Sequence, residues 1–146
     1  MTVRPTINVR YLKDEDIRAC VEIAFECWPD SDRVRRHLTH ELLDITNYTV
    51  VAETDKKIVG WASWTWSRVS YDIAEFVWCN IKPAYQRQGI GKVLTQVRID
   101  SVRFQDGKAI ILTTGHPEVY AKYGFETVKV LPLWIGPETH FMIKQL

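Results

Sequence analysis

YQRQGIGKVL, residues Tyr85–Leu94, decides the fold: it is a turn with two glycines that runs directly into an amphipathic helix. The hydrophobic run Ile73–Ile81 precedes it and predicts a β-strand. A strand that opens into a glycine turn at a helix start exposes backbone N–H groups in front of the positive end of the helix dipole. This arrangement is typical of phosphate-binding sites. Gly89 lets an anion approach the main chain, and Gly91 lets the first helical turn pack tightly.

Two familiar phosphate-binding motifs do not fit this turn. A Walker loop needs a hydroxyl residue after Gly91-Lys92, where Val93 stands, and another glycine five positions before Gly91. A dinucleotide fingerprint would need a third glycine in place of Leu94. What remains is Q/R-x-x-G-x-G over residues 86–91. This hexapeptide resembles the coenzyme A pyrophosphate signature of the GNAT superfamily of N-acetyltransferases.

Other segments resemble the same superfamily. IKPAY at residues 81–85 is similar to its V-x-P-x-Y lead-in, and YAKYGF at residues 120–125 is similar to its Y-x-x-x-G-F segment. Val59-Gly60 in a predicted strand and the terminal FMIK at residues 141–144 also fit. The resemblance covers nearly the whole chain and is strongest from Ile73 to Glu126.

Length and composition indicate an ordinary globular protein. A chain of 146 residues suits a single domain over residues 1–146, and 46% hydrophobic with 25% charged residues is typical of a soluble protein. The net charge of +1 argues against nucleic acid as a partner. The sequence shows no signal, lipidation motif or membrane-spanning run, and its three cysteines lack metal or disulfide spacing. We therefore expect a cytoplasmic protein.

The hydrophobic periodicity predicts the element order β-α-α-β-β-β-α-β-α-β-β. Strands are expected at residues 9–12, 48–53, 57–66, 73–81, 109–114, 128–133 and 139–144. Helices are expected at 15–27 with Asp14 as N-cap, at 32–43, from 90 onward, and at 117–123 closed by Gly124. This order implies an α/β (α+β) fold: a single mixed, mostly antiparallel sheet of about seven strands with helices on both faces. The GNAT superfamily shows the same order.

The resemblance implies that acetyl-CoA is the cofactor. Backbone groups of Asn80, Ile81 and Lys82 would bind the pantetheine arm as an extra strand. The pyrophosphate would be held by the amides of Arg87, Gln88, Gly89, Ile90, Gly91 and Lys92. The alternative is a glycine turn that merely joins the strand to the helix.

Glu75 is the first candidate for a catalytic role. It lies in the apolar run IAEFVWCNI, where an ionised carboxylate is costly unless the strand opens to a cleft. AEFVWCNI is similar to the AEIVFCAI-type strand of the histone-acetylating branch, whose glutamate acts as a base through water. The separation of 11 positions from Glu75 to Gln86 agrees as well. The alternative is a solvent-facing glutamate paired with Lys or Arg on a neighbouring strand.

Tyr120 is the second candidate. It occupies the tyrosine position of the Y-x-x-x-G-F segment, where the family places a phenol near the coenzyme sulfur and able to protonate a departing thiolate. The alternative is a tyrosine that packs on the sheet; Tyr123 is a competitor for which core packing is expected. Many relatives carry an asparagine several residues earlier, whereas residues 113–116 here read TTGH. A contact to the pantetheine amide is therefore missing or comes from another group.

The remaining candidates are less specific. His37 and His40 share a helix face without a third metal ligand, so no metal is expected. Cys79 flanks the proposed pantetheine strand, but no His-Asp partner pattern accompanies it. Tryptophans including Trp28 and Trp78 either line an acceptor pocket for an apolar or cationic amine or fill the core.

Taken together, these features favour an acetyl-CoA-dependent N-acetyltransferase that moves an acetyl group to a primary amine by direct transfer in a ternary complex. A non-catalytic acyl-CoA sensor or docking module is the alternative. Small-molecule amines, peptide N-termini and lysine side chains all remain open as acceptors. So do a longer acyl group and the oligomeric state, a homodimer included.

Overall fold

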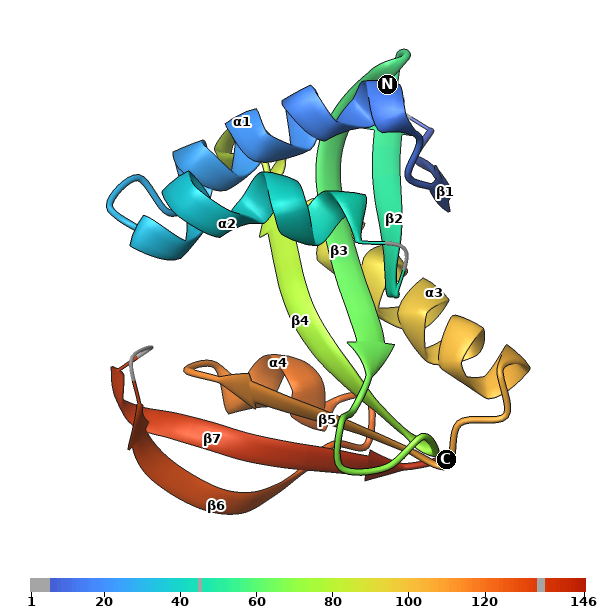
Figure 1. Cartoon of the computed structure of the whole chain (residues 1–146), viewed down its shortest axis with the longest axis vertical. Coiled ribbons are helices and arrows are strands. Elements are labelled where there is room, and N and C mark those ends of the chain that lie inside the picture. Colours follow the sequence, from blue (N-terminus) through green and yellow to red (C-terminus); the bar gives the residue numbers. More distant parts are fainter. Residues whose placement is uncertain (1–5, 45, 134–135) are drawn as a thin grey trace. The chain divides into compact units, whose positions relative to one another are not determined.

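The computed structural model describes residues 6–44, 46–133 and 136–146 (Figure 1). Its strands are β1 (Asn8–Tyr11), β2 (Asn47–Thr54), β3 (Lys57–Trp66), β4 (Ile73–Ile81), β5 (Ala109–Thr114), β6 (Glu126–Leu133) and β7 (Gly136–Gln145). Its helices are α1 (Ile17–Cys27), α2 (Asp32–Leu43), α3 (Ile90–Phe104) and α4 (Pro117–Ala121), with short 3-10 turns η1 (Asp14–Asp16) and η2 (Pro83–Tyr85). Within the described ranges, no helix is long and apolar enough to cross a membrane.

The strands form one seven-stranded sheet in the order β1-β2-β3-β4-β5-β7-β6. The β1–β2, β5–β7 and β6–β7 pairs are antiparallel, whereas β4 and β5 run parallel. The predicted fold class is therefore confirmed. The expected single domain stays a prediction, because the contacts group the chain into two compact units. The first comprises Met1–Trp64 and Trp78–Ile99, and the second comprises Thr65–Val77 and Asp100–Leu146.

In the first unit, helices cover both faces of the sheet because apolar side chains alternate along the strands. Val51 and Trp61 join one buried cluster with α1 and α2, including Cys20 and Leu38. Val50 and Ala52, the neighbours of Val51, join a second cluster with Ile90 and Leu94 of α3. Each Å² of apolar surface that is buried contributes ~25 cal/mol to stability, so these buried side chains provide the main stabilisation of the unit.

The β2–β3 hairpin follows its predicted turn. Asp55 and Lys56 have φ values of 49° and 63°, so both turn residues are left-handed. Two successive left-handed residues match the right-handed twist of the flanking strands. The polar turn at residues 54–56 therefore fixes the pairing of two long strands.

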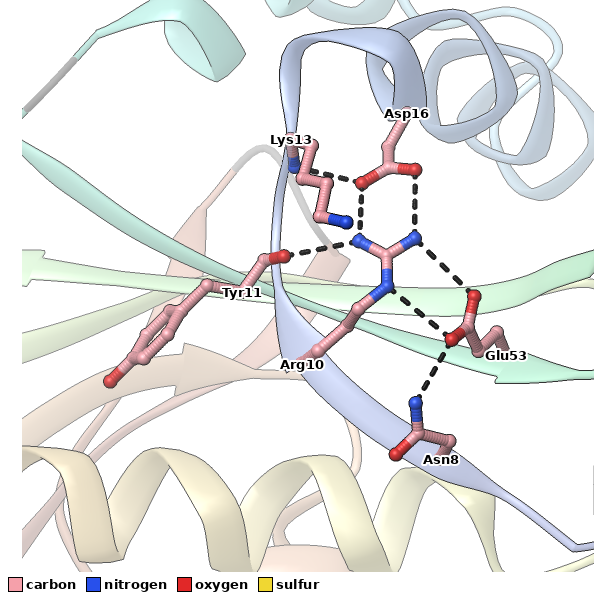
Figure 2. Close-up of polar contacts among 6 residues, drawn as sticks. All are labelled: Asn8, Arg10, Tyr11, Lys13, Asp16 and Glu53. Carbon is pink, nitrogen blue, oxygen red and sulfur yellow. Dashed lines mark hydrogen bonds and ion pairs between the residues drawn. The ribbon is translucent and has the colours of Figure 1, made fainter. Parts of the chain in front are cut away.

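The start of the first helix differs from the prediction. Asp14 does not cap it; the chain enters through η1, and α1 begins at Ile17. The carboxylate of Asp16 instead accepts the backbone N–H of Lys13 at 2.8 Å and contacts Arg10 (Figure 2). An ion pair with Arg10 of β1, six residues earlier, thus accompanies this start of the helix.

The second unit contains α4 and the strands β5, β6 and β7. Helix α4 ends at Ala121, earlier than the predicted Tyr123. Gly124 nevertheless has the positive φ of 89° expected of a residue that ends a helix. The ring of Phe125 packs 5.8 Å from those of Phe76 and Tyr120 (centroid to centroid), which connects β4 to α4 through side chains.

Candidate active site

The turn before α3 has an unusual backbone. Arg87 and Gly89 both have positive φ, 62° and 86°. For Arg87 this left-handed conformation costs about 1–2 kcal/mol, whereas glycine adopts it freely. Strain retained at a non-glycine residue is common where a turn must orient its N–H groups for function.

This turn keeps its backbone donors available. Over the described residues, the N–H groups of Arg87, Gln88 and Gly89 have no hydrogen-bond acceptor. A Cβ atom built on Gly89 would meet nothing within 4 Å, so the space beside the main chain is open. One on Gly91 would lie 3.1 Å from Ile81 Cδ1, which confirms the close packing expected of that glycine. Ile90 is buried and holds the start of α3 in place.

The end of β4 leads into this turn. The N–H of Lys82 donates to the carbonyl of Val59 at 2.8 Å, so this group is committed to β3. Because the C=O and N–H of one trans peptide group point in opposite directions, the carbonyl of Ile81 lies on the other edge. There it accepts the Cys27 thiol at 3.3 Å and the Gln86 side-chain amide at 3.1 Å. Of the expected pantetheine contacts, the Ile81 carbonyl therefore lies on the edge of β4 that faces away from β3, which we call the outer edge. The Lys82 N–H faces β3 instead.

The side-chain amide of Asn80 is buried and makes a contact outside the sheet. It is 1% exposed, and its Oδ1 accepts the indole N–H of Trp28 at 2.7 Å. Its Nδ2 is buried and has no partner among the described atoms. The indole therefore fixes the orientation of the amide next to the outer edge of β4.

Glu75 lies in the second unit, at the point where the described β4–β5 pairing ends. It is half-buried, and its register partner is Ile111, the last in this parallel pair. Within residues 6–44, 46–133 and 136–146 it forms no ion pair with Lys or Arg. The alternative interpretation, a strand glutamate paired across the sheet, is therefore not what the structure shows.

Tyr120 also lies in the second unit, at the end of α4. Its half-buried ring meets Phe125 edge-on, with an interplanar angle of 74°. Its carbonyl accepts the N–H of Tyr123 at 3.0 Å, which begins the turn that follows α4. The described contacts do not join Tyr120 directly to Glu75. Both residues remain candidates.

The cysteines are poor nucleophiles. Burial raises the pKa of the Cys79 thiol, an effect that Arg98 partly offsets. Burial likewise raises the pKa of Cys27, and it raises that of Cys20 to about 12. A raised thiol pKa leaves little thiolate at neutral pH, which disfavours an acetyl-cysteine mechanism.

A polar cluster between α2 and β4 was not expected from the sequence. Arg33 Nη2 donates to Glu41 Oε1 at 2.9 Å, and Trp78 Nε1 donates to Glu41 Oε2 at 2.9 Å. Arg33 Cζ also lies 4.8 Å from the centroid of the Trp78 ring. The spacing of Arg33 and Glu41 on one helix indicates a shared face, but no sequence signal pairs them with Trp78.

Comparisons with known proteins agree with this architecture. A family model described as acetyltransferase (GNAT) domain matches residues 46–127, more than half of the chain. The uncharacterized N-acetyltransferase YhbS of Escherichia coli K12 is 26% identical over 120 residues, which cover 75% of this chain and 70% of YhbS.

Solved structures share the fold. A GCN5-related N-acetyltransferase from Kribbella flavida has a TM-score of 0.82 at 19% identity, covering 96% of this chain and 98% of that one. The PaiA N-acetyltransferase from Thermoplasma acidophilum, solved with coenzyme A, has a TM-score of 0.78 at 20% identity, covering 97% and 99%. The chain belongs to the GNAT family of acetyltransferases, and is by class an N-acetyltransferase.

Proposed function

We propose that the chain binds acetyl-CoA and transfers its acetyl group directly to a primary amine in a ternary complex. The turn before α3 carries this proposal: its N–H groups at Arg87, Gln88 and Gly89 have no acceptor in the described chain, and Gly89 borders open space. Free amides in front of a helix dipole suit a diphosphate. With Ile90, Gly91 and Lys92 they form the expected pyrophosphate-binding set. Acetyl-CoA supplies the acetyl group as a thioester.

The outer edge of β4 is suited to the pantetheine arm. The Ile81 carbonyl now holds a thiol, which is a weak donor, and the amide of the exposed Gln86. An amide of the pantetheine arm would replace these donors at little cost. On the same edge, the N–H of Ile81 would polarise the thioester carbonyl. Asn80 and Lys82 flank this position.

Glu75 and Tyr120 would move the protons. The Glu75 carboxylate would take a proton from the attacking amine through a water molecule, and Tyr120 Oη would give one to the leaving sulfur. A half-buried carboxylate with no ion pair in the described structure is available for this task. Both residues lie in the second unit, whereas the turn and Ile81 lie in the first.

Release of CoA thiol from acetyl-CoA on addition of an amine panel tests the function. We expect release that depends on the amine. Binding of CoA without release from any amine would instead support a sensor or docking module.

Replacing Tyr120 tests its role. Tyr120→Phe should lower kcat by about 10²-fold or more and leave the affinity for CoA almost unchanged, because only proton transfer to sulfur is lost. Tyr123→Phe, one helical turn on, is the matched control and should behave like the wild type. Unaltered turnover of Tyr120→Phe would remove Tyr120 from the mechanism.

Replacing Glu75 tests the base. Glu75→Gln should lower the rate at neutral pH, and high pH should restore much of it because more of the amine is then already deprotonated. The measurement is the pH profile of kcat/KM for both proteins. Equal rates at every pH would exclude Glu75.

A further inference from the structure

Arg33, Glu41 and Trp78 form a cluster that the proposed transfer step does not use; we call it the Arg33 cluster. The guanidinium donates from Nη2 and Nε to Glu41 Oε1 at 2.9 and 3.2 Å. It also lies over the Trp78 ring, whose N–H donates to the second oxygen of Glu41. One cation is thus held by a carboxylate and an aromatic face, the two groups that proteins most often use to bind cations.

The cluster combines an aromatic ring packed on the core with a partly exposed ion pair. The Trp78 ring packs 5.9 Å from the ring of Trp61, which is fully buried. The Arg33 side chain is 42% exposed and the Glu41 side chain 29%. An ion pair this exposed contributes little to stability, and Arg33 loses rotamer freedom by making it. Another cation can therefore replace Arg33 at small cost, while Trp78 and Glu41 stay in place.

We propose that Trp78 and Glu41 form a subsite for a second positive charge on the amine acceptor, and that Arg33 fills this subsite until the acceptor displaces it. The inference rests on the proposed function, because it concerns the acceptor of that reaction. It assigns the acceptor class: primary amines that carry a further ammonium or guanidinium group. A net charge of +1 gives the chain no overall attraction for a cation, so the selection depends on these local groups.

The position of Trp78 on β4 sets the spacing of the two charges. A strand advances ~3.3 Å per residue, so Trp78 lies roughly 7–10 Å along β4 from Asn80 and Ile81. The amide of Ile81 is the group proposed to polarise the thioester carbonyl. The second charge should therefore lie several bonds away from the reacting nitrogen.

Two acceptors of equal length test the subsite: hexamethylenediamine and 6-amino-1-hexanol, in which a hydroxyl replaces the second ammonium. The wild type should favour the diamine by about tenfold in kcat/KM. Glu41→Gln and Trp78→Leu should bring this ratio toward one. Arg33→Ala should raise kcat/KM for the diamine, because the internal competitor is gone. Arg36→Ala removes the same charge from an exposed position of α2 and should keep the wild-type ratio.

Each outcome has a clear meaning. A wild-type ratio near one, or a drop in diamine kcat/KM for Arg33→Ala, would overturn the subsite while thiol release with the amino alcohol still supports the transferase. No release with either amine, while other members of the amine panel give release, would overturn the subsite alone, and no release with any amine would contradict the proposed function as well. The wild-type ratio and Arg33→Ala decide the question even if Glu41→Gln does not fold.

Discussion

Two polar regions of the first unit treat their hydrogen-bonding groups in opposite ways. Around Arg10, donors and acceptors are paired within the chain: the guanidinium contacts Asp16 at 2.7 and 3.0 Å and Glu53 at 3.3 and 3.4 Å (Figure 2). In the turn before α3, the N–H groups of residues 87–89 have no acceptor within the described chain. The first region uses its polar groups for stability, and we propose that the second keeps its N–H groups for an anion.

The energetic consequences differ accordingly. Removing one partner of a buried ion pair leaves the other charge without compensation, which strongly destabilises the fold. Exposed backbone donors cost little when no ligand is bound, because water satisfies them. Substitutions in the two regions should therefore separate stability from coenzyme affinity.

The largest effect is expected at Gly89. Gly89→Val places a β-branched side chain at a φ of 86°, in the open space that the diphosphate would occupy. Two lost charge-assisted hydrogen bonds at ~1.5 kcal/mol each correspond to about 100-fold weaker binding of CoA. Isothermal titration calorimetry measures this affinity.

Lys56 in the β2–β3 turn provides the matched control, because its φ of 63° is also left-handed. Lys56 already carries the cost of a left-handed side chain, so Lys56→Val should add only the smaller cost of a β-branched residue there, without affecting CoA binding. Equal affinities of Gly89→Val and Lys56→Val for CoA would contradict an anion site at Gly89.

A smaller effect, on stability alone, is expected at Arg10. Arg10→Met leaves Asp16, whose side chain is 6% exposed, without its cation. Because Arg10 itself is 26% exposed, we expect a loss of about 2 kcal/mol in the free energy of unfolding, below the full value for a buried pair. Urea unfolding measures it, and CoA affinity should stay at the wild-type value.

Arg18 serves as the control for this variant. Its ion pair with Glu22 on α1 is exposed, with 91% of the Arg18 side chain accessible. Arg18→Met should therefore change the unfolding midpoint very little. If both arginine variants lose the same stability, burial of Asp16 is not the cause.

The smallest effect is a pH dependence. Hydrogen bonds from Arg10 hold the pKa of Asp16 below its ordinary value of 3.8, although burial opposes this shift. A carboxyl with a depressed folded pKa stabilises the fold above the unfolded pKa and loses this contribution as pH falls through the folded pKa. As the pH is lowered below about 4, the urea midpoint of unfolding should decrease, and it should decrease less steeply for Asp16→Asn than for the wild type. Equal slopes would contradict the assignment.

The sequence predicts the sheet and most helices because periodicity is a local property. The bounds of α2, β3, β4 and β5 agree with the expected 32–43, 57–66, 73–81 and 109–114. The predicted start of α1 was wrong: the Asp16 carboxylate pairs with Arg10 of β1, and the helix begins at Ile17. Helix α4 is shorter than expected, since the N–H groups of Tyr123 and Gly124 donate to carbonyls only three residues back, those of Tyr120 and Ala121, in a tighter turn.

The candidate site was predicted only where backbone chemistry defines it. Gly89 and Gly91 mark the turn because glycine is required at a positive φ or at a close approach. The contacts of Trp28 with Asn80 and of Arg33 with Trp78 join residues far apart in the chain. Only the fold brings such pairs together, so residue spacing could not predict them.

Amide chemical shifts on titration with CoA test the central claim most directly, with pantetheine as the matched ligand that lacks the diphosphate. We predict that CoA shifts the amides of residues 87–91 far more than those of Arg10 and Asp16, and that pantetheine leaves residues 87–91 almost unchanged. If CoA binds without moving these amides, or pantetheine moves them equally, the turn before α3 is not the diphosphate site.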